Sequence, residues 1–212
     1  MSAPRPVPGP PAPVPSGASV PAVVWVVAGP PGAGKSTAAR ALARLLSPPG
    51  AVLDKDTLFS GLVAEVIDAH GRGQGEREGS WYDEHAKRHE YAGLTAAAAE
   101  IRRAGCPPVL VAPFTQEIRD PDRWAAWVGR LGGDPVRLVW VSCPAAELYQ
   151  RLLRRGRGRD AGKVAAFEEF AARMRPEEPP PVPHWRIDTS DARPRSSVQL
   201  AALLGGGEVS DR

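Results

Sequence analysis

The sequence predicts an α/β fold with a parallel sheet, and two observations lead to this expectation. Along the middle of the chain, short apolar runs alternate with stretches of helix-forming residues, which is the pattern of a parallel sheet built from βαβ units. The first run, Val23–Val27, is followed by a glycine-rich turn and then by Ala38–Leu46, which consists of good helix formers. A buried strand that leads through a glycine turn into a helix is typical of this class.

Five apolar runs are predicted to be the strands of the sheet. Most of them are rich in valine, leucine and isoleucine on every position, as expected of strands buried on both faces. They lie at 23–28, 51–53, 109–112, 136–142 and 184–188.

The segments between these runs are predicted to be helices. The first follows the glycine turn and ends at Leu46, because Pro48, Pro49 and Gly50 cannot continue it. In the second helix we expect Leu58, Leu62 and Val66 to form one apolar face, with Ile67 as a further candidate. The later helices are predicted at 83–104, around 124–131, and at 145–155, 164–174 and 196–204, with a glycine-rich loop at 70–80.

Residues 29–37 read G-P-P-G-A-G-K-S-T, a complete phosphate-binding loop of the form Gly-x-x-x-x-Gly-Lys-Ser. Glycines let the backbone curl so that its N–H groups point at an anion, and the helix that follows adds its positive end. Lysine can bridge the β- and γ-phosphates, and the serine hydroxyl can bind Mg²⁺. The predicted nucleotide-binding residues of this loop are Gly29, Pro30, Pro31, Gly32, Ala33, Gly34, Lys35, Ser36 and Thr37.

Two carboxylates, Asp54 and Asp56, follow the second predicted strand. In open α/β sheets, ligands lie beyond the carboxyl ends of the strands, so both aspartates are expected to face the phosphate loop. One can take a proton from an attacking hydroxyl, and the other can help to hold Mg²⁺. Asp56 is also a reasonable N-cap of the next helix, a role that can coexist with catalysis.

Five arginines lie between positions 151 and 159, with glycines among them. The planar guanidinium group binds phosphate oxygens in pairs, so these residues suit a lid that closes over phosphates and expels water. Arg151 is predicted to bind the nucleotide, and Arg155 and Arg159 to act in catalysis with Lys35. A solvated basic face or a nucleic-acid patch is the alternative.

The composition favours one reduced, cytoplasmic domain. The chain has 212 residues, 42% of them hydrophobic, a net charge of +3, and two cysteines far apart. It has no apolar run of about 18 residues and no pattern of a signal peptide. We expect a Pro-rich disordered tail at 1–21, a domain at 22–204 and a flexible tail at 205–212. Such a protein is a monomer or homodimer, with nucleic acid and membrane as unlikely partners.

With these three segments the chain resembles the P-loop kinase superfamily, over about residues 23–190. The resemblance is closest to a branch of small AAA-type kinase-like proteins, which is similar to chloramphenicol phosphotransferase, adenylylsulfate kinase, polynucleotide 5′-kinase and the zeta-toxin kinases. It implies a three-layer P-loop NTPase fold with a five-stranded parallel sheet in the order 2-3-1-4-5. It also implies ATP and Mg²⁺ as cofactors and a hydroxyl as acceptor. The family's general base falls best on Asp56, with Asp54 as second choice, and its lid arginines fall on Arg151, Arg155 and Arg159.

Two positions depart from the family pattern. Phe59 stands where adenylylsulfate and polynucleotide kinases often carry an arginine, and the run 109–112 lacks the aspartate that many relatives have there. Mg²⁺ must therefore rest on Ser36, water and Asp54. A small-molecule kinase is the leading interpretation; a nucleoside or polynucleotide 5′-kinase, a non-catalytic ATP-binding regulatory protein and a toxin-type sugar kinase stay open.

By the same resemblance, the acceptor lies between the helix after the second strand and the helix at 83–104. The polar and aromatic residues expected there are Trp81, Tyr82, Asp83, Glu84, His85, Arg88, His89 and Tyr91. Thr115, Gln116 and Arg119 follow the third strand and are candidates to reach the phosphates or the acceptor. Residues 188–190 lie where related kinases hold the adenine base.

Overall fold

The computed structural model describes residues 21–73, 79–156, 160–190 and 195–206. Its centre is a five-stranded sheet in the order β2-β3-β1-β4-β5, and every neighbouring pair of strands is parallel. This confirms the predicted class and strand order. The strands are β1 (Val24–Ala28), β2 (Ala51–Asp54), β3 (Pro108–Val111), β4 (Val136–Ser142) and β5 (Trp185–Asp188).

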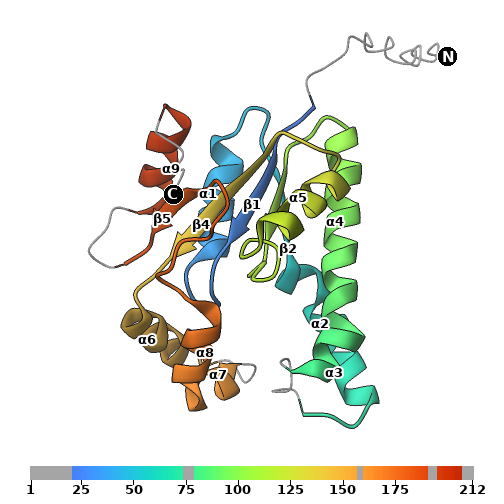
Figure 1. The fold of residues 1–212 in the computed structure, drawn as a ribbon, viewed down its shortest axis with the longest axis vertical. Helices are drawn as coiled ribbons and strands as arrows, with labels where there is room; N and C mark the ends of the chain where they lie inside the picture. Colours follow the sequence, from blue (N-terminus) through green and yellow to red (C-terminus); the bar gives the residue numbers. More distant parts are fainter. Residues whose placement is uncertain (1–20, 74–78, 157–159, 191–194, 207–212) are drawn as a thin grey trace, which may run out of the picture.

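Helices cover both faces of the sheet, as Figure 1 shows. They are α1 (Lys35–Leu45), α2 (Lys55–Ala69), α3 (Ser80–Tyr82), the π-helix η1 (Asp83–Lys87), α4 (Arg88–Arg103), α5 (Pro121–Arg130), α6 (Ala145–Arg155), α7 (Ala161–Ala165), α8 (Phe167–Met174) and α9 (Ser196–Leu204). Because strand side chains alternate between the two faces, β1 divides the core in two. Trp25 and Val27 pack with α1, α6, α8 and α9, whereas Val24, Val26 and Ala28 pack with α4 and α5.

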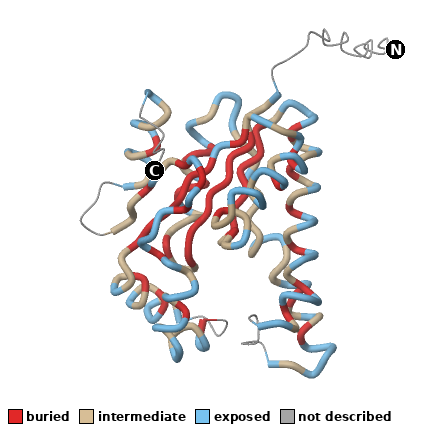
Figure 2. The backbone as a smooth tube through the Cα atoms, viewed as in Figure 1, coloured by how far each residue is buried: buried red, intermediate tan, exposed pale blue. Residues whose placement is uncertain are grey.

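β1 and β3 are buried along their whole length, and β4 is buried except at Arg137 (Figure 2). β1 is flanked by β3 and β4, so the loop after β1 lies at the middle of the sheet's carboxyl edge. β2 pairs with β3, with Asp54 opposite Val111 at the end of the ladder. The loop after β1 and the residues after β2 are therefore held at the same edge.

The predicted face of α2 is wrong at its two leucines and right at Ile67. Leu58 is 48% exposed and Leu62 is 64% exposed, whereas Val63 and Ile67 are buried. Val63 and Ile67 pack against α3 and η1, and Phe59 packs against α4. The leucines were assigned inward from hydrophobicity alone, which does not show the direction of the partner helix.

Two other helices differ in their boundaries. The single helix predicted at 164–174 is two helices, α7 and α8, separated by Ala166 with φ −120° and ψ 51°. The helix predicted from Asp83 begins as the π-helix η1 and becomes α-helical at Arg88. The predicted tails at 1–21 and 205–212 fall largely outside the described residues.

Candidate active site

The phosphate loop has the backbone conformation that its glycines allow. Gly29 has a φ of 145°, and a Cβ there would lie 2.3 Å from the carbonyl oxygen of Val141, so no side chain fits. Gly34 has a φ of 92° and is the N-cap of α1. Because no side chain caps this helix, its first N–H groups are open to an anion.

Lys35 lies between this loop and the two aspartates. Its Nζ donates to the carbonyl oxygen of Pro30 at 3.0 Å. Burial lowers the pKa of Lys35 to about 8, and the negative charges of Asp56 and Asp54 oppose that shift. Lys35 is thus a poorly hydrated cation close to both carboxylates, where the charge of a phosphate would stabilise its protonated form.

Asp54 connects the loop to the start of α2. Its Oδ2 accepts a hydrogen bond from the Ser36 hydroxyl at 2.5 Å, and its Oδ1 accepts from the backbone N–H of Asp56 at 3.0 Å. The helix therefore begins at Lys55 with Asp54 as its N-cap, and the N-cap role predicted for Asp56 is wrong. Ser36 and Asp54 place a hydroxyl and a carboxylate oxygen in contact, a donor set that fits Mg²⁺.

Asp56 stands at the open side of the same edge. Its side chain is 46% exposed, and the ammonium group of Lys55 lies 3.4 Å from its Oδ1. The backbone hydrogen bond to Asp54 fixes the residue in the first turn of α2. A carboxylate that is held at its backbone and still accessible can accept a proton from a bound hydroxyl.

A buried carboxylate that the sequence analysis missed holds Lys55 in place. Glu90 of α4 is 4% exposed. Its Oε1 accepts from Lys55 Nζ at 2.9 Å, and its Oε2 accepts from the Tyr82 hydroxyl at 2.5 Å. This network joins α2, α3 and α4 directly beneath Asp56. The sequence does contain a signal for the burial of Glu90, because this residue lies four positions before Leu94 and eight before Ala98, on the same buried face of α4.

Arg151 supports the phosphate loop through Thr189. Its guanidinium donates to the hydroxyl of Thr189 at 3.1 Å and also to its carbonyl oxygen, and it lies 3.2 Å from Glu147. The Thr189 hydroxyl lies 2.8 Å from the carbonyl oxygen of Ala33. Segment 188–190, predicted near the adenine base, thus contacts the loop directly.

Arg155 is paired within its own region. Its Nε and one terminal nitrogen donate to Oδ2 of Asp160 at 2.8 and 2.6 Å, and Asp160 is 2% exposed. Its charge acts on Lys35, where it lowers the pKa. Arg159 lies outside the described residues, so the arginine-rich lid remains a prediction.

The residues expected around the acceptor separate into three groups. The first group lies in α3 and η1: Trp81 stacks on His85 with ring centroids 5.0 Å apart and also contacts His70, the C-cap of α2, and Tyr82 is buried in the Glu90 network. Arg119 is the second group. Arg119 donates to the carbonyl oxygens of Pro179 and Arg175 at 3.1 and 2.9 Å, and therefore holds two loops together.

The third group lines a pocket of about 570 Å³ between η1, α4 and α5. It includes several of the residues predicted near the acceptor, namely Asp83, Arg88, Tyr91, Thr115 and Gln116. Phe59, at the position where relatives often carry arginine, instead packs against Gly93 of α4.

Within the described ranges, no three histidine, cysteine or acidic side chains gather as a metal site. No helix of the described chain is long and apolar enough to cross a membrane.

Comparison with known proteins places this site in a family. The sequence model of the family described as AAA domain (AAA_33) matches residues 24–177. No curated protein sequence matches the chain.

Among solved structures, the chain is similar to a protein from Chloroflexus aurantiacus J-10-fl, with 18% identity, a TM-score of 0.59, and coverage of 89% of this chain and 97% of that one. It is also similar to the APS kinase of Mycobacterium tuberculosis, with 22% identity, a TM-score of 0.55 and coverage of 87% and 96%. A sugar kinase from Janibacter sp. HTCC2649 shows 15% identity, a TM-score of 0.57 and coverage of 90% and 97%. These likenesses share the fold, and the matched family covers most of the domain: the chain belongs to the AAA domain family AAA_33 and has the fold of the P-loop kinases.

Proposed function

We propose that the protein is a phosphotransferase that moves the γ-phosphate of Mg-ATP to a hydroxyl group of a small molecule. One observation carries the proposal: Lys35, Ser36, Asp54 and Asp56 meet at the carboxyl edge of β1 and β2, where hydrogen bonds join Ser36, Asp54 and Asp56 and both carboxylates act on the charge of Lys35. A loop that only bound a nucleotide would not need an accessible carboxylate beside the lysine. The likeness to solved P-loop kinases supports the same class.

The roles follow from the geometry. The open N–H groups of the loop and of α1 bind the phosphates, and Lys35 neutralises charge on the β- and γ-phosphates. Ser36 and Asp54 would hold Mg²⁺, which supplies further neutralisation of phosphate charge when it is bound. Asp56 accepts the proton of the acceptor hydroxyl as the oxygen attacks phosphorus, and the bond from phosphorus to the leaving oxygen of ADP breaks. Arg155 would stabilise the phosphoryl group once its hydrogen bonds to Asp160 are replaced by hydrogen bonds to phosphate oxygens.

One observation favours a second candidate, a non-catalytic ATP-binding protein. β3 ends with Val111 and Ala112, so no carboxylate follows the strand between β1 and β2. Such a protein would keep Lys35 and Ser36 for binding and would not depend on Asp56.

The test is transfer of labelled γ-phosphate from Mg-ATP into a panel of sugars, nucleosides, hydroxy acids, aminoglycosides, phenicols and short oligonucleotides. Wild type is compared with Asp56→Asn and with Glu100→Gln, a matched carboxylate-to-amide change on the exposed side of α4. Asp56→Asn should lower transfer about 10²- to 10⁴-fold and leave ATP binding intact, because general-base catalysis contributes on that order. Glu100→Gln should retain full transfer. Equal transfer in wild type and Asp56→Asn would refute the role of Asp56, and tight ATP binding without any transfer would favour the regulatory protein.

A further inference from the structure

The pocket between η1, α4 and α5 has a rigid aromatic floor. Trp127 is 2% exposed, and its indole N–H donates to the Thr95 hydroxyl at 2.9 Å. That hydroxyl donates in turn to the carbonyl oxygen of Tyr91 at 2.8 Å. Phe114 packs against both rings, with centroids 5.5 Å from Tyr91 and 4.7 Å from Trp127. The ring faces are therefore fixed before any ligand binds.

The segment that closes the pocket is held in an unusual conformation. Phe114 is fully buried and has a φ of 48°, in the left-handed region that bulky residues rarely occupy. Such strain persists only where the surroundings enforce it, and it is frequent at ligand sites. Here the aromatic contacts hold Phe114, and the turn directs residues 115–117 over the pocket.

The rim of the pocket carries a carboxylate and a guanidinium that the protein leaves available. Glu117 and Arg130 both line the cavity. Among the described residues, neither side chain makes a hydrogen bond or ion pair with another side chain. Partial burial raises the pKa of Glu117, opposed first by a hydrogen bond from its own backbone and then by the charges of Lys87, Arg130 and Arg123. By contrast, Lys87 is already paired with Asp83 at 2.9 Å.

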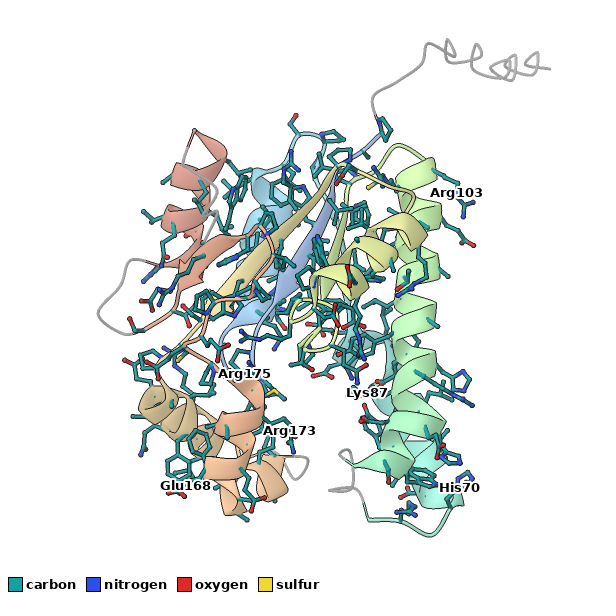
Figure 3. The ribbon with its side chains drawn as sticks, viewed as in Figure 1. His70, Lys87, Arg103, Glu168, Arg173 and Arg175 are labelled. Atoms are coloured by element: carbon teal, nitrogen blue, oxygen red, sulfur yellow. The ribbon has the colours of Figure 1, made fainter. Side chains whose placement is uncertain are left out.

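The pocket adjoins the phosphate-transfer edge. Residues 115–117 follow β3, which lies between β2, with Asp54 at its end, and β1, which leads into the phosphate loop. Tyr91 follows Glu90 in α4, the Glu90 carboxylate accepts from Lys55 at 2.9 Å, and the Lys55 ammonium group lies 3.4 Å from Asp56. Figure 3 shows Lys87 on the side of α4 that faces the rest of the molecule, whereas Arg103 projects outward from the other end of the helix.

We propose that this pocket is the acceptor site and that its ligand is a neutral polyhydroxylated molecule, a sugar or polyol. A hydroxyl group both donates and accepts, so neighbouring hydroxyls satisfy Glu117 and Arg130 together. The half-buried ring of Tyr91 provides an apolar surface for the C–H groups of a sugar ring, and the buried Trp127 holds that ring in place through Thr95 and Phe114. A volume of about 570 Å³ accommodates such a molecule. The inference rests on the proposed phosphotransferase activity and adds the class of its acceptor.

The decisive experiment measures acceptor binding and phosphate transfer separately. The acceptor panel contains D-glucose, D-ribose, sorbitol and myo-inositol, beside gluconate, adenosine and thymidine. Acceptor binding is measured by saturation-transfer NMR without ATP, and KM values for acceptor and ATP are measured in the transfer assay. The variants are Glu117→Gln and Arg130→Met, with Glu100→Gln and Arg103→Met as matched controls on the exposed surface of α4.

We expect at least one of the four sugars or polyols to bind and to accept phosphate. Glu117→Gln and Arg130→Met should each raise its KM about tenfold or more, the usual effect of losing a hydrogen bond to a charged group. The KM for ATP should stay unchanged, as should both KM values in the controls. A variant that merely damaged the fold would change the KM for ATP as well.

Each contrary result has a distinct meaning. If phosphate is transferred to an acceptor whose KM is the same in all variants, the pocket is not the acceptor site, and the proposed function still holds. A preference for gluconate or the nucleosides over neutral sugars would overturn the acceptor class. If no acceptor is phosphorylated, the proposed function fails. Sugar binding that is abolished by Glu117→Gln and Arg130→Met would then still support this pocket as a sugar-binding site. Absence of sugar binding would overturn that assignment.

Discussion

The two walls of the candidate site are built differently. On the wall formed by the phosphate loop and the start of α2, charged side chains face one another: Ser36 contacts Asp54, and Lys35 lies close to Asp54 and Asp56. On the wall formed by α6, α7 and the end of β5, the cations are paired with protein groups. Arg151 is bound to Thr189 and Glu147, and Arg155 is bound to Asp160.

This difference in charge pairing indicates which wall can bind a ligand without first breaking ion pairs within the protein. The first wall offers open N–H groups and the ammonium group of Lys35, whose hydrogen bond to the Pro30 carbonyl oxygen uses one of its three donors, so a phosphate can bind there without breaking that bond. On the second wall, a phosphate must displace carboxylate or carbonyl oxygens before an arginine can bind it. We therefore expect nucleotide binding to depend most on the first wall, and we rank the following predictions accordingly.

The largest effect is expected from Lys35→Met. Removing the cation that faces the phosphates should lower phosphoryl transfer about 10²- to 10³-fold, the range found when one charge-stabilising group is removed from a buried site. Initial rates at saturating ATP measure this effect, with Arg103→Met as the matched loss of an exposed cation. A loss under fivefold would contradict the importance of the first wall.

The next effect concerns the support beneath the first wall. Glu90→Gln removes the nearer of two charge partners of Lys55 and leaves Asp56 at 3.4 Å, so it should lower the free energy of unfolding by about 1.5–3 kcal/mol. Tyr82→Phe removes one hydrogen bond from the same carboxylate and should cost about 1 kcal/mol. Chemical denaturation measures both, with Glu100→Gln as control. If Glu90→Gln is as stable as wild type, the network does not hold α2 and α4 together.

Arg151→Met and Thr189→Val test how the second wall acts. Thr189→Val removes the hydroxyl that links Arg151 to the loop and keeps the charge, and it should weaken ATP binding a few fold. Arg151→Met should weaken it about tenfold, the effect of one charge-assisted hydrogen bond. Dissociation constants for ATP separate the two roles: equal losses mean that Arg151 acts only through Thr189, and a larger loss in Arg151→Met means that it also contacts the nucleotide.

The smallest effect is a pH dependence from Lys35. Its pKa is lowered to about 8, so the free protein loses this proton as the pH rises through 8. Phosphate charge restores the proton, and ATP binding should therefore take up protons near pH 8.5 and weaken above pH 8 by at most about tenfold per pH unit. Calorimetry in buffers of different ionisation enthalpy measures the uptake, and Lys35→Met should abolish it.

The same shift affects stability with a definite sign. The pKa of an unperturbed lysine side chain is 10.5. Between about pH 8 and 10.5, the unfolded chain therefore binds more protons at this position than the folded chain does. The contribution of Lys35 makes the folded state relatively more stable as the pH rises through this range. Chemical denaturation of wild type and Lys35→Met across this range would show it as a difference in slope.

Local patterns predicted most elements of this fold correctly. β4, α6 and α9 begin and end where the apolar runs and turn residues indicated, and β1 and α1 flank the loop as expected. The phosphate loop can be predicted from the sequence because its chemistry depends on backbone conformation, and glycines at fixed spacing indicate that conformation directly. The position of Asp54 and Asp56 beside the loop can be predicted because residues that follow parallel strands lie at the same edge of the sheet.

Properties that depend on the partner of an element required the tertiary structure. The direction in which α2 turns its apolar residues is set by α3, η1 and α4, and for that reason Leu58 and Leu62 are exposed. The burial of Glu90 is set by Lys55 and Tyr82, residues 35 and 8 positions away in the chain. Whether Arg151 and Arg155 face a phosphate or a protein oxygen is decided by Thr189 and Asp160.

By itself, then, the sequence determined the sheet, the phosphate loop and the carboxylates at its edge, because short-range periodicity and backbone freedom specify them. The tertiary structure alone decided which of the charged side chains are already paired and which remain available in the pocket beside α4. Charge pairing and burial depend on distances between segments far apart in the chain, and no local pattern contains those distances.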